Sequence, residues 1–240
     1  MTFGKAFIHA HRETLAFMLA CPLIAMIPVV GELFQHYVEM GLGMYDGTDG
    51  AQAAEAAPAR MQAGMIKIFT LSFIGYPLVR FLAGGRDAAA ARTLEPRAAA
   101  TFAVVLFIQL AIAAMDLFAM QGSPAVSLAV FAAMLVLTPL FLRWMVAAPL
   151  GIWVSPARSA REMLPSLAWA VVFTFTVMLP LMVVHYGLGI GAIFAPDALK
   201  WPLLILDSFV VGALAIVIGA GNWIAAIRPG PVIGNHAATA

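Results

Sequence analysis

Long runs of apolar residues dominate this sequence. A helix needs about 20 residues to cross the hydrocarbon core of a bilayer, and six stretches reach that length: Thr14–Phe34, Ala63–Leu82, Ala98–Ala119, Ala125–Ala148, Ser166–Ile190 and Leu203–Ile227. Their apolar residues lie on all sides and do not alternate as in a strand, and a backbone in lipid must satisfy its own hydrogen bonds. The sequence therefore predicts an all-α polytopic membrane protein with six transmembrane helices.

Composition supports a single membrane domain. Of 240 residues, 63% are hydrophobic and 10% charged, whereas soluble domains have about 45–50% and about 25%. The spans leave no stretch for a separate folded head, so we expect one six-helix domain over residues 1–228 and a flexible tail over 229–240. The net charge of +1 indicates no nucleic-acid partner, and the one cysteine, Cys21, excludes an internal disulfide.

Several details of the spans and their connections follow from local sequence. Prolines inside the apolar stretches predict bent helices: Pro22, Pro28, Pro77, Pro139 and Pro180. We expect a short interfacial helix before the first span, a polar loop over Gln35–Gln62, and short basic helices within Gly84–Arg97 and Ser155–Ser166. The Met18–Cys21 segment loosely resembles a lipoprotein cleavage box, but the apolar run continues beyond it, which predicts a retained helix.

The distribution of basic residues predicts the orientation. With the N-terminus inside, ten Lys and Arg residues lie on the cytoplasmic side, and only Arg60, Lys67 and Lys200 lie outside. Cytoplasmic loops carry the excess of positive charge in membrane proteins. Both termini are therefore expected in the cytoplasm.

Ionisable residues near the outer ends of the spans form the first candidate site. At 1.5 Å per residue, one residue from each of four spans lies within roughly 5–8 Å of the outer boundary. The first span adds Glu32, His36 and Glu39 at its outer end, with the imidazole one turn from each carboxylate on a common face. The candidate set is Glu32, His36, Lys67, Asp116, His185 and Asp207. Charged groups within a membrane are costly, which makes them functional hypotheses. They could bind a cation or relay a proton, or instead reach the headgroups or form pairs that lock the helices together.

Cofactor and enzyme chemistry receive less support. A haem held by His36 and His185 would need a roomy buried pocket, and His36 is expected at the water boundary, so no cofactor and no bound metal are predicted. The sequence has no GxSxG, HExxH or phosphate-binding glycine loop. Ser208 follows Asp207 on one helix, where neighbours point about 100° apart, which is unsuitable for a triad with His185. No catalytic residue is predicted.

Arginines after the fourth span form the second candidate site. Arg143, Arg158 and Arg161 could bind lipid phosphate, because a guanidinium contacts phosphate through two hydrogen bonds. The alternative is that they act as ordinary interfacial anchors, together with the tryptophans beside them.

Three stretches carry a resemblance to a known family. They are FGKAFIHAHRETLAFMLACPLIAMIP, RFLAGGRDAAAARTLEPRAAATF and RWMVAAPLGIWVSPARSAREMLPSLAW. In layout the chain resembles six-span bacterial inner-membrane proteins of the YciC type, which are related to the membrane domain of some glycerophosphodiester phosphodiesterases. Arg143, Pro149, Arg158 and Arg161 would occupy the family's places, whereas its Ser-Trp-Arg-Leu-Thr stretch is replaced here by Ala-Arg-Glu-Met-Leu. The resemblance implies a location in the bacterial inner membrane and no established catalytic residues.

These observations rank three functions. The first is a non-enzymatic accessory or lipid-associated protein that packs against a membrane partner or itself, for which small residues such as Gly187, Gly189 and Gly191, and Gly212, Gly219 and Gly221, permit close helix contact. The alternative is a small cation- or proton-linked transporter that uses the outer acidic and histidine layer, and an intramembrane enzyme comes third. An outward glycine face would favour a partner, whereas an internal polar cavity would favour transport.

Overall fold

Helices make up all the regular structure in the computed structural model, which describes residues 1–119 and 124–230. They are α1 (Phe3–Ala20), α2 (Pro22–Gly41), α3 (Gly47–Glu55), α4 (Pro58–Phe73), α5 (Gly75–Ala83), α6 (Ala88–Arg92), α7 (Pro96–Ala119), α8 (Pro124–Leu140), α9 (Leu142–Ala147), α10 (Pro156–Met163), α11 (Leu167–Phe194) and α12 (Asp197–Ile227), with short 3-10 turns at Ala148–Leu150 and Leu164–Ser166. Within the described residues, four continuous helical stretches are long and apolar enough to cross a membrane, and two bent helix pairs raise the number to as many as six if each pair is one span. The prediction of an all-α protein with several membrane-spanning helices is confirmed, and its orientation stays a prediction.

The first predicted span is not one helix. α1 and α2 meet at Cys21 with a bend of 102°, and α1 runs without interruption from Phe3, so the expected short interfacial lead-in is part of a longer helix. Proline disfavours the helical conformation of the residue before it, and Cys21 has φ −131° and ψ 55°. Pro22 then occupies the first turn of α2, where a missing N–H group costs nothing. The bend turns α2 back against the rest of the protein.

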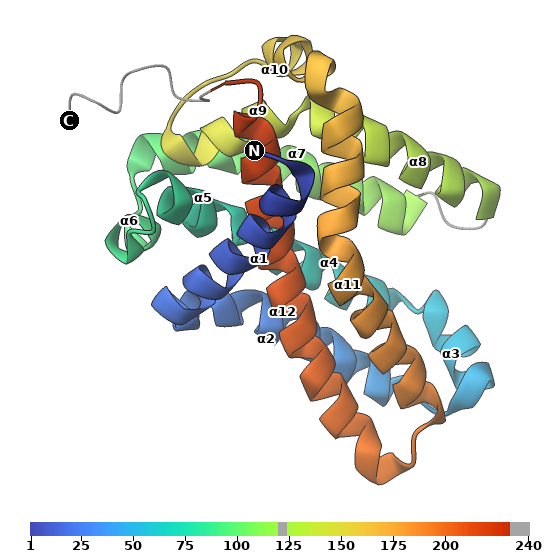
Figure 1. Ribbon diagram of the computed structural model, residues 1–240. Coiled ribbons are helices and arrows are strands. Elements are labelled where there is room, and N and C mark those ends of the chain that lie inside the picture. Colours follow the sequence, from blue (N-terminus) through green and yellow to red (C-terminus); the bar gives the residue numbers. More distant parts are fainter. Residues whose placement is uncertain (120–123, 231–240) are drawn as a thin grey trace.

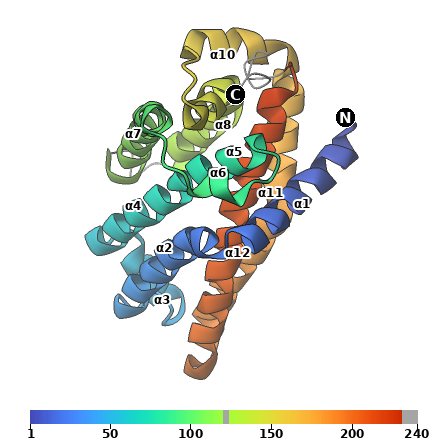
Figure 2. The same ribbon diagram turned by 90° about the vertical axis from the view of Figure 1, so that its left-hand side faces the viewer.

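α12 forms the centre of the fold (Figures 1 and 2). It packs along α11 and also contacts α1 and α2. Three of its glycines allow this close packing, because an added Cβ would lie 2.5 Å from Val29 at Gly212 and 2.8 Å from Val177 at Gly221, with a similar contact at Gly219. These small residues thus serve contacts within the chain and fix the position of Asp207.

The connections differ in part from expectation. The predicted loop Gln35–Gln62 is largely helical, because α2 continues to Gly41 and α3 follows it. The two inner segments do hold short helices, α6 and α10, whose first turns are capped by the side chains of Asp87 and Ser155. The extension of α2 is the change that matters for the site, because it carries two ionisable residues into the protein.

Candidate functional site

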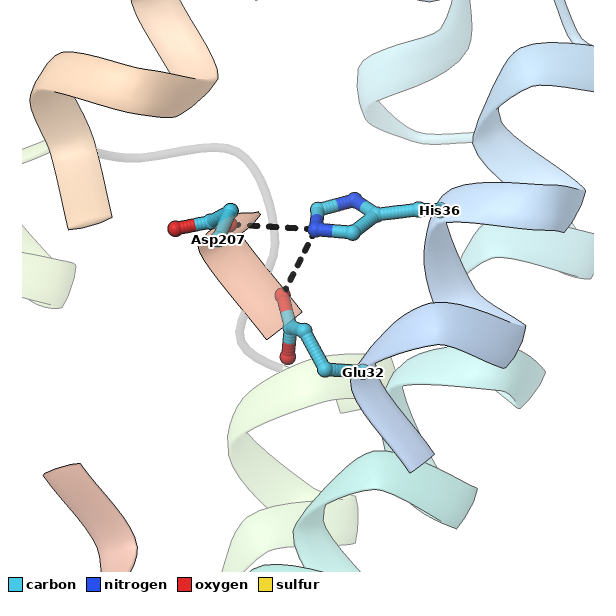
Figure 3. Close-up of side chains that lie close together, drawn as sticks. All are labelled: Glu32, His36 and Asp207. Carbon is cyan, nitrogen blue, oxygen red and sulfur yellow. Dashed lines mark hydrogen bonds and ion pairs between the residues drawn. The ribbon is translucent and has the colours of Figure 1, made fainter. Parts of the chain in front are cut away.

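His36 lies at the centre of a buried group of charged side chains (Figure 3). Its Nε2 atom is 3.0 Å from Oδ2 of Asp207 and 3.4 Å from Oε1 of Glu32. Glu32 is one turn before His36 on α2, whereas Asp207 is on α12. All three residues are buried, with exposed fractions of 1% for Glu32, 3% for His36 and 0% for Asp207. The contact between α2 and α12 therefore brings together two carboxylates and an imidazole.

Two further residues extend this group to neighbouring helices. His185 on α11 places Nδ1 2.8 Å from Oδ1 of Asp207, and Lys67 on α4 places Nζ 2.7 Å from Oε2 of Glu32. The structure thus brings five of the six predicted residues into one connected cluster. Asp116 is the exception, because it is exposed on α7 and takes part in none of the ion pairs of the described residues.

Glu39 anchors a second part of the network. It lies one turn after His36 and accepts hydrogen bonds from Tyr45 Oη at 2.6 Å, Gln35 Nε2 at 2.7 Å and Arg60 Nε at 2.9 Å. The spacing of Glu32, His36 and Glu39 predicts their common helix face, and the structure confirms that His36 lies near both carboxylates. Nothing in the sequence indicated the contributions of Tyr45 and Arg60. We refer to the whole set as the His36 cluster: Glu32, Gln35, His36, Glu39, Tyr45, Arg60, Lys67, His185 and Asp207.

The contacts of His36 define where its protons are. Burial and the neighbouring Glu39 carboxylate raise the pKa of Tyr45, so its hydroxyl stays protonated and donates to Glu39. Its oxygen is then an acceptor for His36 Nδ1, which lies 2.8 Å away. The other nitrogen, Nε2, faces the carboxylates of Asp207 and Glu32, which only accept. Both ring nitrogens therefore face acceptors, and both donate when His36 is an imidazolium.

This assignment balances the charge of the cluster. Its three carboxylates carry three negative charges, while Lys67 and Arg60 supply two positive charges. A His36 imidazolium supplies the third positive charge. Loss of one proton would leave one uncompensated negative charge in a buried site, which is costly. The three carboxylates therefore need one positive charge beyond Lys67 and Arg60, and a proton on His36 supplies it.

Glu32, His36 and Asp207 are also the residues that could hold a metal ion. One ligand atom from each lies within 4.8 Å of the other two, and imidazole with carboxylates suits several divalent metals. His36 must be neutral to ligate a metal, so metal binding there would release the proton assigned above. The haem arrangement considered from the sequence placed iron between His36 and His185, and in the structure the carboxylate of Asp207 joins these two rings. His36 is buried within the protein, and its depth in the membrane stays a prediction.

The predicted phosphate-binding arginines have different surroundings. Arg143 is buried, pairs with Glu162, and donates through Nη1 to the carbonyl oxygens of Ala226 at 3.0 Å and Gly230 at 2.9 Å. It thereby ties α9 to the end of α12 and differs from an open headgroup contact. Arg158 and Arg161 are exposed on α10, where Arg158 also pairs with Glu162. A lipid-phosphate role for these two stays a prediction.

These features define a helical membrane protein with a buried, charge-balanced histidine–carboxylate cluster between its helices. No known family model, no curated protein and no solved structure matches the chain. The functional argument therefore rests on the cluster and on the space around it.

Proposed function

We propose that this protein is a small proton-linked membrane transporter in which the His36 cluster holds the exchangeable proton. The observation that carries the proposal is the set of contacts of His36, whose two nitrogens both face buried acceptor groups. Ionisable residues buried between membrane helices commonly mark proton relays and ion pathways. Transport was the second function considered from the sequence, and the burial of the cluster supports proposing it here.

The position of the cluster gives the proton a means of moving helices. Asp207 of α12 contacts His36 of α2 and His185 of α11, and Lys67 links α4 through Glu32. Removal of the proton replaces an attraction between His36 and Asp207 with an unbalanced negative charge. The helices then lose one of the contacts that hold them together, which is the kind of switch that alternating access requires.

Proton flux in liposomes tests the proposal. With an imposed pH gradient and an internal pH-sensitive dye, the reconstituted parent protein should increase proton flux above that of empty liposomes. Asp207→Asn should remove most of this increase, because the carboxylate that joins both histidines is lost. Asp116→Asn is the matched control, since Asp116 is exposed and lies outside the cluster.

Two outcomes contradict the proposal. One is a parent protein whose flux equals that of empty liposomes, which would leave the cluster as a structural lock between helices. The other is an equal effect of the two substitutions. A loss of flux in Asp207→Asn counts only where that variant elutes as the folded parent does in size-exclusion chromatography.

A second candidate function is an accessory protein that packs against a membrane partner or another copy. It is favoured by Gly187, Gly189 and Gly191 on α11, where an added Cβ would meet no atom within 4 Å. Gly187 and Gly191 are one turn apart on the same face of α11, and two such open small residues permit close approach by another helix. Gly187→Leu should then change the oligomeric state or remove a co-purifying protein in mild detergent, and an unchanged result would contradict this function.

A further inference from the structure

A partly enclosed cavity of about 470 Å³ lies beside the His36 cluster. Its wall is mostly apolar and comes from several helices, with Phe102 on α7, Met145 on α9, Met182 on α11 and Ile218 on α12. Binding sites for small molecules have volumes of about 300–1,000 Å³ and mostly apolar walls. The cavity therefore has the size and surface of a site for one small apolar molecule.

The cavity is elongated along α12. Its lining residues Val211, Leu214, Ala215, Ile218, Gly219 and Asn222 recur every three or four positions and so occupy one face of this helix. At 1.5 Å per residue, the eleven steps from Val211 to Asn222 cover about 16 Å. Asp207 lies one turn before Val211 on the same helix. The long axis of the cavity thus runs away from the His36 cluster.

The polar end of the cavity carries basic groups. Lys67 and His185 both line it and both belong to the cluster, whereas none of the described lining residues is an aspartate or glutamate. An ammonium has three N–H donors, and Nζ of Lys67 forms an ion pair with Oε2 of Glu32. His185 directs Nδ1 to Asp207, and in the described part of the chain its Nε2 has no hydrogen bond of its own. A donor and an acceptor are therefore available beside the apolar wall.

We propose that this cavity binds a carboxylic acid with a long apolar body, whose head contacts Lys67 and His185. A carboxyl group matches the pair, because its carbonyl oxygen accepts from the Lys67 ammonium and its O–H donates to Nε2 of His185. An amine-headed amphiphile would bring a positive charge to Lys67 without a carboxylate in the wall to compensate it. The idea that this acid is the transported substrate rests on the proposed function. The binding of the acid to the cavity is measured separately.

Photo-cross-linking tests the site. The purified protein in phosphatidylcholine nanodiscs is irradiated with dodecanoic acid that carries a terminal diazirine, and the modified residues are mapped by mass spectrometry. We expect modification of the apolar wall, at Met182 or Ile218 among others. Unlabelled dodecanoic acid should compete about tenfold better than dodecylamine, as expected for the gain of a charge-assisted hydrogen bond.

Two Ile→Trp substitutions on α12 separate filling of the cavity from the general effect of a larger side chain. Ile218→Trp fills the cavity and should reduce cross-linking about tenfold, whereas Ile205→Trp changes an exposed residue of the same helix outside the cavity and should not. Met182→Trp fills the cavity from α11 and replaces Ile218→Trp if that variant does not fold.

The outcomes separate this inference from the proposed function. Labels confined to exposed residues, equal labelling of both Ile→Trp variants, or equal competition by dodecylamine would overturn the site. Stronger competition by dodecyl phosphate than by dodecanoic acid would overturn the carboxyl assignment in favour of a phosphate head. None of these measurements uses a pH gradient, so their failure leaves proton flux as the test of transport.

Discussion

Asp207 offers the most direct perturbation of the His36 cluster. It has an exposed fraction of 0%, and its two carboxylate oxygens lie 2.8–3.0 Å from nitrogens of His36 and His185. In Asp207→Asn the side chain keeps nearly the same shape, but one oxygen becomes an N–H₂ group that faces a ring donor. The substitution also leaves the cluster with one positive charge in excess. Its effect on stability therefore measures the charge balance directly.

The expected loss of unfolding free energy in Asp207→Asn follows from these contacts. Breaking a buried ion pair by removal of one partner costs about 3–5 kcal/mol, because the other charge stays buried and unpaired. Unfolding by SDS in mixed micelles, followed by circular dichroism, measures this loss against the parent protein. Asp116→Asn should change the free energy of unfolding by no more than about 0.5 kcal/mol, since that residue is exposed.

A double variant makes the reasoning refutable. Asp207→Asn combined with His36→Gln removes one negative and one positive charge, so the remaining carboxylates of Glu32 and Glu39 again match Lys67 and Arg60. The double variant should then lose about 1–3 kcal/mol less than the sum of the single variants. Additive losses, or a loss below about 1 kcal/mol for Asp207→Asn, would refute the imidazolium assigned to His36.

Three further outcomes are expected. Gly212→Ala should cost about 1–3 kcal/mol of unfolding free energy, because its Cβ would lie 2.5 Å from a valine methyl group, whereas Gly187→Ala meets no atom within 4 Å and should cost nothing. Lys67→Met should destabilise by about 3 kcal/mol by removing the ammonium paired with Oε2 of the buried Glu32, and Glu32→Gln in the same chain should recover part of that loss. Arg92→Cys should resist an impermeant maleimide added to intact cells, where the one native thiol is 1% exposed and gives little background; labelling would overturn the cytoplasmic position of that loop.

The sequence predicts a common depth for these ionisable residues, but it does not predict how each helix is rotated about its axis. Lys67, His185 and Asp207 come from three predicted spans, and the structure joins them through two further residues. Asp116 has the same predicted depth but is exposed. α7 is apolar around its whole circumference, so its sequence contains no signal for the face that turns inward. For that reason the predicted set of residues at this depth included Asp116, which does not belong to the site.

The sequence predicts that prolines bend the helices, but it does not predict which proline coincides with a sharp bend. Pro28 lies inside α2 and Pro180 inside α11 without ending either helix, whereas the chain turns by 102° before Pro22. A helix tolerates proline where neighbouring groups accommodate the lost hydrogen bond, and this depends on tertiary contacts. Hydropathy also averages over such a bend, because the residues on both sides of Cys21 are equally apolar.

The missed bend determines the character of the candidate site. A straight first span would place His36 and Glu39 at the water boundary, where solvent screens charge and an exposed pair contributes about 0–1 kcal/mol. The turn at Cys21 instead lays α2 against α4 and α12, and both residues become 97% buried. In that environment each charge requires a partner, and a change of one proton alters the contacts between helices. The same residues that would have been interfacial anchors on a straight helix thus become members of a buried cluster of paired charges.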